Sequence, residues 1–192
     1  MLTTIRLEGV EPVSLDEAKA AARVDGNDLD GFIQGAIGTA RECAEHITGR
    51  TYRQQVQRQS FADWPASTEV LRVFGATAVS VQYWDGTQFV QLDDADVAFF
   101  EAGIGGAGTS IAPALGSSWP ALGSVAGGPR VRVDVTSGPT GDEDAIRVPE
   151  SVKTYIKAQV AAWLKNPEAI AGGTLVENPL LATLLDRECL WV

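Results

Sequence analysis

Apolar residues near both ends of the chain recur at intervals of three and four, which is the spacing of one face of an α-helix. In the first part of the chain, Ser14 and Glu17 make the pattern of a capping box, which predicts a short helix over 15–23. A longer amphipathic helix is predicted over 28–49, with Asp28 as its N-cap residue and a glycine at its end.

Two more helices are predicted at the other end of the chain. Pro149, a residue favoured at the first helical position, opens a helix that runs to residue 165, and a leucine-rich helix follows over 179–189. Because the stripes on 28–49 and 149–165 have no other apolar partner, we expect these two helices to pack together. The residues expected to face one another are Phe32, Ile33, Ile37 and Ile47 on the first helix and Ile156, Val160 and Trp163 on the second.

The middle of the chain changes to the period of two that is typical of β-strands. Strands are predicted over 52–61, 69–74, 79–84, 89–92, 97–100 and 130–136. Asp85-Gly86 is a hairpin turn signal, and the polar segment 52–61 suits an edge strand or a strand paired with a neighbour. The Gly-rich stretch 103–128 is predicted to be a long loop with at most one strand, near 110–112.

These elements predict an α+β fold. The expected architecture is a small helical bundle formed by the N- and C-terminal helices, with a β-rich insertion between them. The helical body is assigned to residues 1–50 and 149–192, and the β-rich insertion to residues 51–148, with its Gly-rich loop at 103–128.

Composition limits the class of protein. The chain has 192 residues, of which 45% are hydrophobic, enough for one core or one core with a small satellite. It has no run of about 18 apolar residues, so no membrane span is expected. The first residues lack the basic and apolar blocks of a signal peptide, and synthesis in the cytoplasm is therefore expected. In that compartment Cys43 and Cys189 are expected to be free thiols rather than a disulfide.

The formal net charge is −10, and the basic residues are scattered. Residues 85–101 hold five acidic residues and no basic one. Binding to the DNA backbone needs clustered Lys and Arg, so direct DNA binding is disfavoured. The charge is compatible with ordinary solubility, and equally with a surface along which DNA slides without adhering.

No group of reactive side chains converges in the sequence. His46 is the only histidine, and no cysteine or histidine lies at metal-ligand spacing from it. Residues 103–108 match the dinucleotide pattern G-x-G-x-x-G, but Pro113 follows and leaves no helix to meet a pyrophosphate. Asp93, Asp94 and Asp96 lack the spacing of a calcium loop and fit a solvated turn. We therefore predict no catalytic residues, no cofactor and no metal, and a protein that is not an enzyme.

Residues at both ends of the chain resemble the phage head-tail connector family, in particular the adaptor proteins of siphophages and of gene transfer agents. The resemblance is carried by the segments Pro12-Val13-Ser14-Leu15-Asp16-Glu17-Ala18-Lys19, Thr48-Gly49-Arg50, Val148-Pro149-Glu150-Ser151-Val152-Lys153 and Asn166-Pro167-Glu168-Ala169. It is compositional only over 51–148, and the Gly-rich loop matches no family element.

The resemblance implies a non-enzymatic structural protein of the virion, synthesised in the bacterial host cytoplasm and placed at the head-tail junction. Such an adaptor forms a ring with copies of itself, twelve-fold in the particle, and binds the portal protein. On the tail side it meets a completion or tail terminator protein. DNA passes through the ring without specific binding, and no membrane is involved.

The C-terminus ends on the apolar residues Leu190, Trp191 and Val192. An apolar tail either folds back on the core or is kept for a partner. The resemblance favours the partner, and these residues are the predicted portal contact. The alternative function is a non-catalytic intracellular binding module that uses the β insertion to bind a peptide or ligand.

Overall fold

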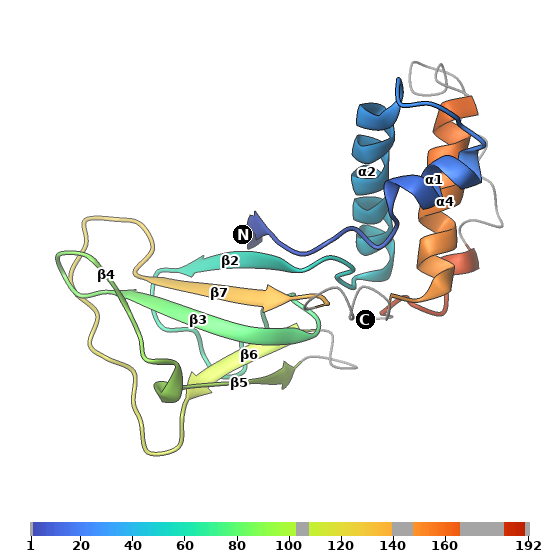
Figure 1. The fold of residues 1–192 in the computed structure, drawn as a ribbon. Helices are drawn as coiled ribbons and strands as arrows, with labels where there is room; N and C mark the ends of the chain where they lie inside the picture. The colour runs from blue at the N-terminus through green and yellow to red at the C-terminus, as the bar shows by residue number, and fades with distance from the viewer. Residues whose placement is uncertain (1, 103–107, 140–147, 166–182, 191–192) are drawn as a thin grey trace. The chain divides into compact units, whose positions relative to one another are not determined.

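The computed structural model describes residues 2–102, 108–139, 148–165 and 183–190. The chain folds into two compact units (Figure 1). A β unit combines residues 2–8 with 54–138, and a helical unit combines 9–53 with 139–190. No described helix has the length and hydrophobicity needed to cross a membrane.

The helical unit contains helices α1 (Leu15–Ala22), α2 (Asp30–Thr48) and α4 (Glu150–Lys165). The three helices pack against one another around a common apolar core, as predicted for 28–49 and 149–165 (Figure 1). The core consists mainly of Val13, Ala18, Ile33, Ala36, Ile37, Ala40, Ala44, Tyr52, Val152, Tyr155, Ile156, Val160 and Leu185.

The helix boundaries follow local signals with two corrections. Ser14 and Glu17 form the predicted capping box: the Glu17 N–H donates to the Ser14 hydroxyl at 3.2 Å, and the Ser14 N–H donates to the Glu17 carboxylate at 2.8 Å. Helix α2, however, has Leu29 rather than Asp28 as its N-cap, without a side-chain hydrogen bond. The predicted helix over 179–189 lies partly outside the described residues, and within them only 183–185 are helical.

The predicted interface of α2 and α4 is wrong for two residues. Phe32 and Ile47 are 45% and 46% exposed, whereas Ile33 and Ile37 are buried. Neighbouring residues of a helix point about 100° apart, so Ile33 turns toward the core and carries Phe32 away from it. Trp163 packs against the core while remaining partly exposed.

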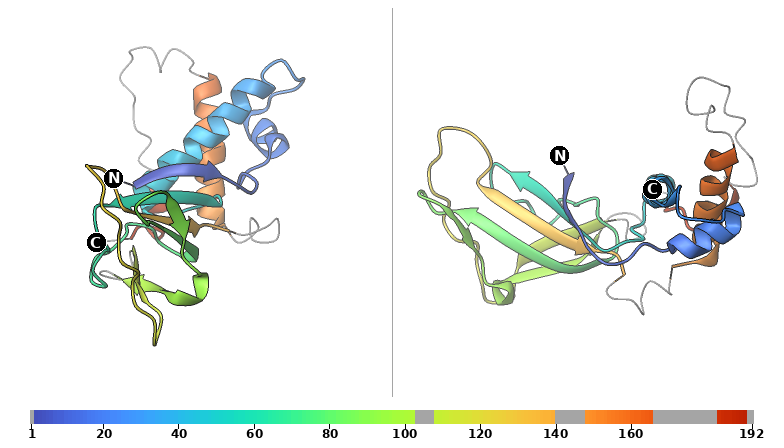
Figure 2. Two further views of the ribbon diagram at one scale, coloured as in Figure 1. Left: turned by 90° about the vertical axis from the view of Figure 1, so that its left-hand side faces the viewer. Right: turned by 45° about the horizontal axis from the view of Figure 1, so that its top comes forward.

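The β unit holds a five-stranded antiparallel sheet and a two-stranded sheet (Figures 1 and 2). The larger sheet has the order β1 (Leu2–Leu7), β2 (Gln55–Phe61), β7 (Val131–Ser137), β3 (Ala76–Trp84) and β4 (Phe89–Gln91). The smaller sheet pairs β5 (Val97–Ala102) with β6 (Gly108–Pro113). Every second residue of β7 is buried, including Val131, Val133 and Val135, as its alternating sequence predicts.

The α+β class is confirmed, but the expected chain order is corrected. Strand β1 precedes all the helices and pairs with β2, so the sheet is not made only from an insertion between helices. Residues 2–8 belong to the β unit rather than to the helical body. Most of β1 is exposed, and a strand without a buried face needs no regular alternation of apolar and polar residues. The sequence therefore carries no period of two that would have marked β1 as a strand.

One further strand prediction needs correction. The segment 69–74 forms no strand, and only Leu71 makes an isolated bridge, with Thr109. Of the two alternatives for the polar segment 52–61, the paired strand is confirmed, because β2 pairs with a neighbour on both sides.

The predicted Gly-rich loop contains β6 and a packed segment over 114–130. Trp119 stacks on Trp64 with ring centroids 4.5 Å apart, and the Trp64 indole N–H donates to the Pro120 carbonyl. The Gly123 N–H donates to the Trp84 carbonyl at 2.8 Å, and a Cβ at Gly123 would lie 2.1 Å from a backbone nitrogen. The glycine is therefore required by close backbone approach, and the segment is tied to the sheet.

Candidate assembly surfaces

The C-terminal segment 183–190 lies against the end of α2. Leu185 is fully buried in the helical core. The Leu190 N–H donates to the Thr48 carbonyl at 2.9 Å, and the Arg50 guanidinium donates to the Glu188 carbonyl at 2.6 Å. The chain is therefore anchored on α2 as far as Leu190.

The end of α2 is shaped to receive this segment. Gly49 follows the helix in the left-handed conformation, with φ of 72°, and its N–H donates to the Glu45 carbonyl. The Leu190 side chain lies beside it, 3.6 Å from the place where a Cβ of residue 49 would stand. Of the three predicted portal-contact residues, Leu190 is half-buried here, while Trp191 and Val192 lie outside the described residues.

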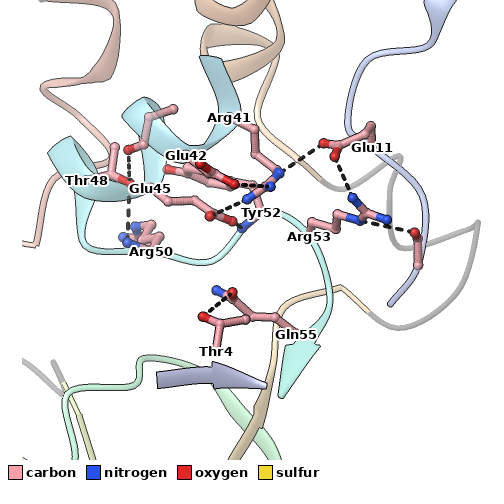
Figure 3. A network of polar contacts seen from close by, with 12 residues as sticks. Thr4, Glu11, Arg41, Glu42, Glu45, Thr48, Arg50, Tyr52, Arg53 and Gln55 are labelled. Carbon is pink, nitrogen blue, oxygen red and sulfur yellow. Dashed lines mark hydrogen bonds and ion pairs between the residues drawn. The ribbon is translucent and has the colours of Figure 1, made fainter. Parts of the chain in front are cut away.

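A buried polar network supports the same end of α2 (Figure 3). The Arg41 side chain is 2% exposed and forms ion pairs with Glu11, Glu42 and Glu45. Glu45 also accepts the Tyr52 N–H at 2.8 Å, which ties the chain after α2 to the helix. Burial raises the pKa of the Glu45 carboxyl, and the Arg41 guanidinium and backbone N–H groups offset that rise in part.

Glu11 links this network to a second cation. Its other carboxylate oxygen pairs with Arg53 at 2.7 Å, and Arg53 also donates to the Gly9 carbonyl. The network therefore joins the segment before α1, the helix α2 and the segment after it into one body. Arg41, Glu42 and Glu45 are neighbours on α2, but Glu11 and Arg53 come from the segments before α1 and after α2, so no local pattern indicated the whole network.

The β unit exposes large apolar side chains around β5 and on β1, besides Val125, which is 43% exposed in the segment after β6. Phe99 and Phe100 on β5 are 41% and 45% exposed, and Leu115, in the turn after β6, is fully exposed. Ile5 and Leu7 on β1 are 45% and 43% exposed. The sequence did not indicate these surfaces, because exposure at a sheet edge depends on which strands pair.

The residues considered as catalytic or metal-binding candidates do not form a site: His46 lies far along the chain from the aspartates, and two of the aspartates hold the local backbone and a turn. His46 is exposed on α2. Asp93 caps a short 3-10 helix, η1 (Asp94–Asp96), by accepting the Ala95 N–H, and Asp96 accepts the Ser117 hydroxyl at 2.6 Å. Within the described residues, no three His, Cys, Asp or Glu side chains are grouped so as to hold a metal ion.

The structure also describes part of the dinucleotide-like pattern and both cysteines. The dinucleotide-like pattern lies mostly outside the described residues, and its last glycine, Gly108, begins strand β6 rather than a helix. Cys43 and Cys189 are free thiols, as predicted.

No protein-family model and no curated protein matches the sequence. Solved structures do match. A chain in the structure "Neck of empty GTA particle computed with C6 symmetry" is 17% identical and has a TM-score of 0.72, over 100% of this chain and 97% of that one. A chain in "Virion of native gene transfer agent (GTA) particle" is 16% identical with the same TM-score and coverage.

A further match is a chain in "Neck of native GTA particle computed with C12 symmetry", at 17% identity and a TM-score of 0.67 with the same coverage. At this level of identity the likeness concerns the fold, and it extends over both units. The protein therefore has the fold of a chain found in the neck of gene transfer agent particles.

Proposed function

We propose that the protein is a structural component of a virion or gene transfer agent particle: a ring-forming head-tail connector, or adaptor. It binds the portal, joins capsid to tail around the DNA channel, and meets a completion or tail terminator protein on the tail side. The observation that carries the proposal is the full-length fold match, with a TM-score of 0.72, to a chain from a particle neck. The residue resemblance to connector proteins at both ends of the chain supports it independently.

The two cyclic symmetries under which the similar neck structures were computed support a ring of copies, and twelve is the number we propose in the particle. The net charge of −10 supports a channel component that DNA passes without adhering. The proposed role is structural rather than enzymatic.

We further propose that Leu190, Trp191 and Val192 contact the portal. Leu190 is anchored through its own N–H, so the chain leaves the end of α2 at a defined point. The apolar residues Trp191 and Val192 follow it. An apolar segment that begins at a fixed point is suited to docking in a groove of a partner, because its starting position is already set before binding.

The experiment is reconstitution with the portal protein of the same particle, followed by native mass measurement. A connector forms a closed complex with the portal ring containing multiple copies of this chain. A protein that stays monomeric with the portal, and instead retains a peptide or small ligand, is the alternative binding module and refutes the proposal.

The portal contact is tested by deleting Trp191 and Val192, which leaves the Leu190 hydrogen bond to Thr48 in place. The deletion is expected to abolish portal binding with an unchanged melting temperature. Phe32→Ala, which removes an exposed apolar side chain at the far end of α2, is the matched control and should bind normally. Portal binding that survives the deletion would refute the contact and leave the connector proposal standing.

A further inference from the structure

Strand β5 has an unpaired edge. It pairs with β6 in an unbroken register from Val97–Pro113 to Ala102–Gly108, and within the described residues no strand pairs with its other side. Its sequence is Val-Ala-Phe-Phe-Glu-Ala, with Glu101 as the only charge. Exposed edges are normally protected by bulges, prolines or several charges, and an even apolar edge is a template for another chain.

The side chains beside this edge are also uncovered. Successive residues of a strand point to opposite faces of the sheet, and yet Phe99 and Phe100 are both more than 40% exposed. Neither face of the outer part of β5 is therefore fully covered by the β unit.

Leu115 extends the same surface from a rigid turn. The Ala114 N–H donates to the Asp96 carbonyl at 2.8 Å, directly before β5 begins, and the Ser117 N–H donates back to the Ala114 carbonyl at 2.9 Å. The Ser117 hydroxyl is bound to the Asp96 carboxylate, and Gly116 supplies the positive φ of 89°. The turn thus holds the leucine outward, fully exposed, at one end of β5.

The β1 edge, at the other margin of the β unit, exposes side chains of both kinds, apolar and basic. There β1 exposes Ile5 and Leu7, with Arg6 between them at 65% side-chain exposure. The register of β1 shifts between Thr4 and Arg6, so this edge is irregular and offers side chains rather than an even row of backbone groups. Both figures of the fold place β1 and β5 at opposite margins of the β unit (Figures 1 and 2).

We propose that the β5 edge, formed by Phe99, Phe100, Glu101 and Leu115, docks on the β1 edge, formed by Ile5, Arg6 and Leu7, of the next copy of this chain. The contact is head-to-tail, and it closes the ring. This inference rests on the proposed function.

Three features select a second copy as the occupant. A ring needs two different surfaces of one chain in contact, and placing them on opposite margins lets each copy use both at once. Each copy carries a net charge of −10, so the copies repel unless they meet where charge is sparse or opposite in sign. The β5 edge is apolar with one acid, Glu101. On the β1 edge, the base Arg6 is 65% exposed and pairs with Glu8 at 2.8 Å in the single chain, and in the ring it exchanges that partner for Glu101 of the next copy.

The first test is Leu115→Glu, assayed by native mass measurement of the ring formed by the purified chain with portal. Leu115 is fully exposed in the single chain, so the substitution should leave the melting temperature unchanged while the ring population falls at least tenfold. Val125→Glu is the matched control, since Val125 is a 43% exposed apolar residue of the same unit outside the proposed contact. It should form rings normally.

The second test identifies the receiving surface. Arg6→Glu and Glu101→Arg are each expected to weaken the ring, and the double variant to restore it, because only the exchanged pair brings opposite charges together again. Full ring formation by Leu115→Glu would overturn the inference, and so would a charge exchange without rescue. If the unsubstituted chain forms no ring with portal, the proposed function itself fails, a result distinct from rings that form regardless of these variants.

Discussion

The buried Arg41 network allows a quantitative prediction. Replacing Arg41 by Met keeps much of the buried stem but removes the charge that faces three carboxylates. Glu11 keeps its ion pair with Arg53, and Glu42 is mostly exposed, so the loss falls on Glu45, whose side chain is only 13% exposed. Removing one partner of a buried ion pair costs about 3–5 kcal/mol, and we expect a destabilisation near the lower value because Glu45 keeps the Tyr52 N–H.

The same variant should have a characteristic pH dependence. Burial already raises the pKa of Glu45, and loss of Arg41 removes one of the interactions that lower it, so its pKa in the folded state rises further. A carboxyl whose pKa is raised on folding contributes stability below its unfolded pKa, and this contribution is lost as the pH rises through its folded pKa. The cost of Arg41→Met should therefore be largest near neutral pH and shrink as the pH is lowered to about 4–5.

The measurement is urea denaturation followed by circular dichroism at a helical wavelength, because all of the described α-helices belong to the helical unit. Glu150→Gln is the control: Glu150, in α4 of the same unit, is 77% exposed and pairs with Lys153 at the surface, so the loss of its charge should cost less than about 1 kcal/mol. A cost for Arg41→Met no larger than that of the control, or one that grows toward acid pH, would show that the reasoning about Glu45 is wrong.

Other substitutions test the packing and the caps. Ile156→Ala removes a fully buried side chain between the helices and should lower the free energy of unfolding by about 2–5 kcal/mol in the same assay. Ser14→Ala removes the α1 cap and should lower the free energy of unfolding by about 1 kcal/mol. Hydrogen bonds from Ser14 lower the pKa of Glu17, so the difference in stability between the variant and the unsubstituted chain should diminish as the pH falls through that lowered pKa. Gly123→Ala puts a methyl group against the backbone of Gly86 and should destabilise the β unit, seen as loss of near-ultraviolet signal from Trp64 and Trp119, with helical signal retained.

Much of the local structure followed from the sequence. Three signals each lie within a single element, and the structure contains all three: the capping box at Ser14, the three- and four-residue spacing of α2 and the alternation of β7. The α+β class followed from the same local periods. These signals are reliable because helix and strand geometry relates residues only a few positions apart.

Tertiary structure decided what depends on distant partners. The mixed sequence of β1, without a regular alternation of apolar residues, became a strand only because β2, some fifty residues later, offers it a ladder of hydrogen bonds. Arg41 pairs with Glu45 within α2, but another of its partners, Glu11, comes from the segment before α1, and only the tertiary structure brings it there. Phe99, Phe100 and Leu115 are apolar like the core residues around them, and their exposure was set by which strands lie inside the sheets and which lie at an edge. Hydrophobicity determines that a side chain favours burial, but the pairing of strands determines which side chains the single chain leaves uncovered.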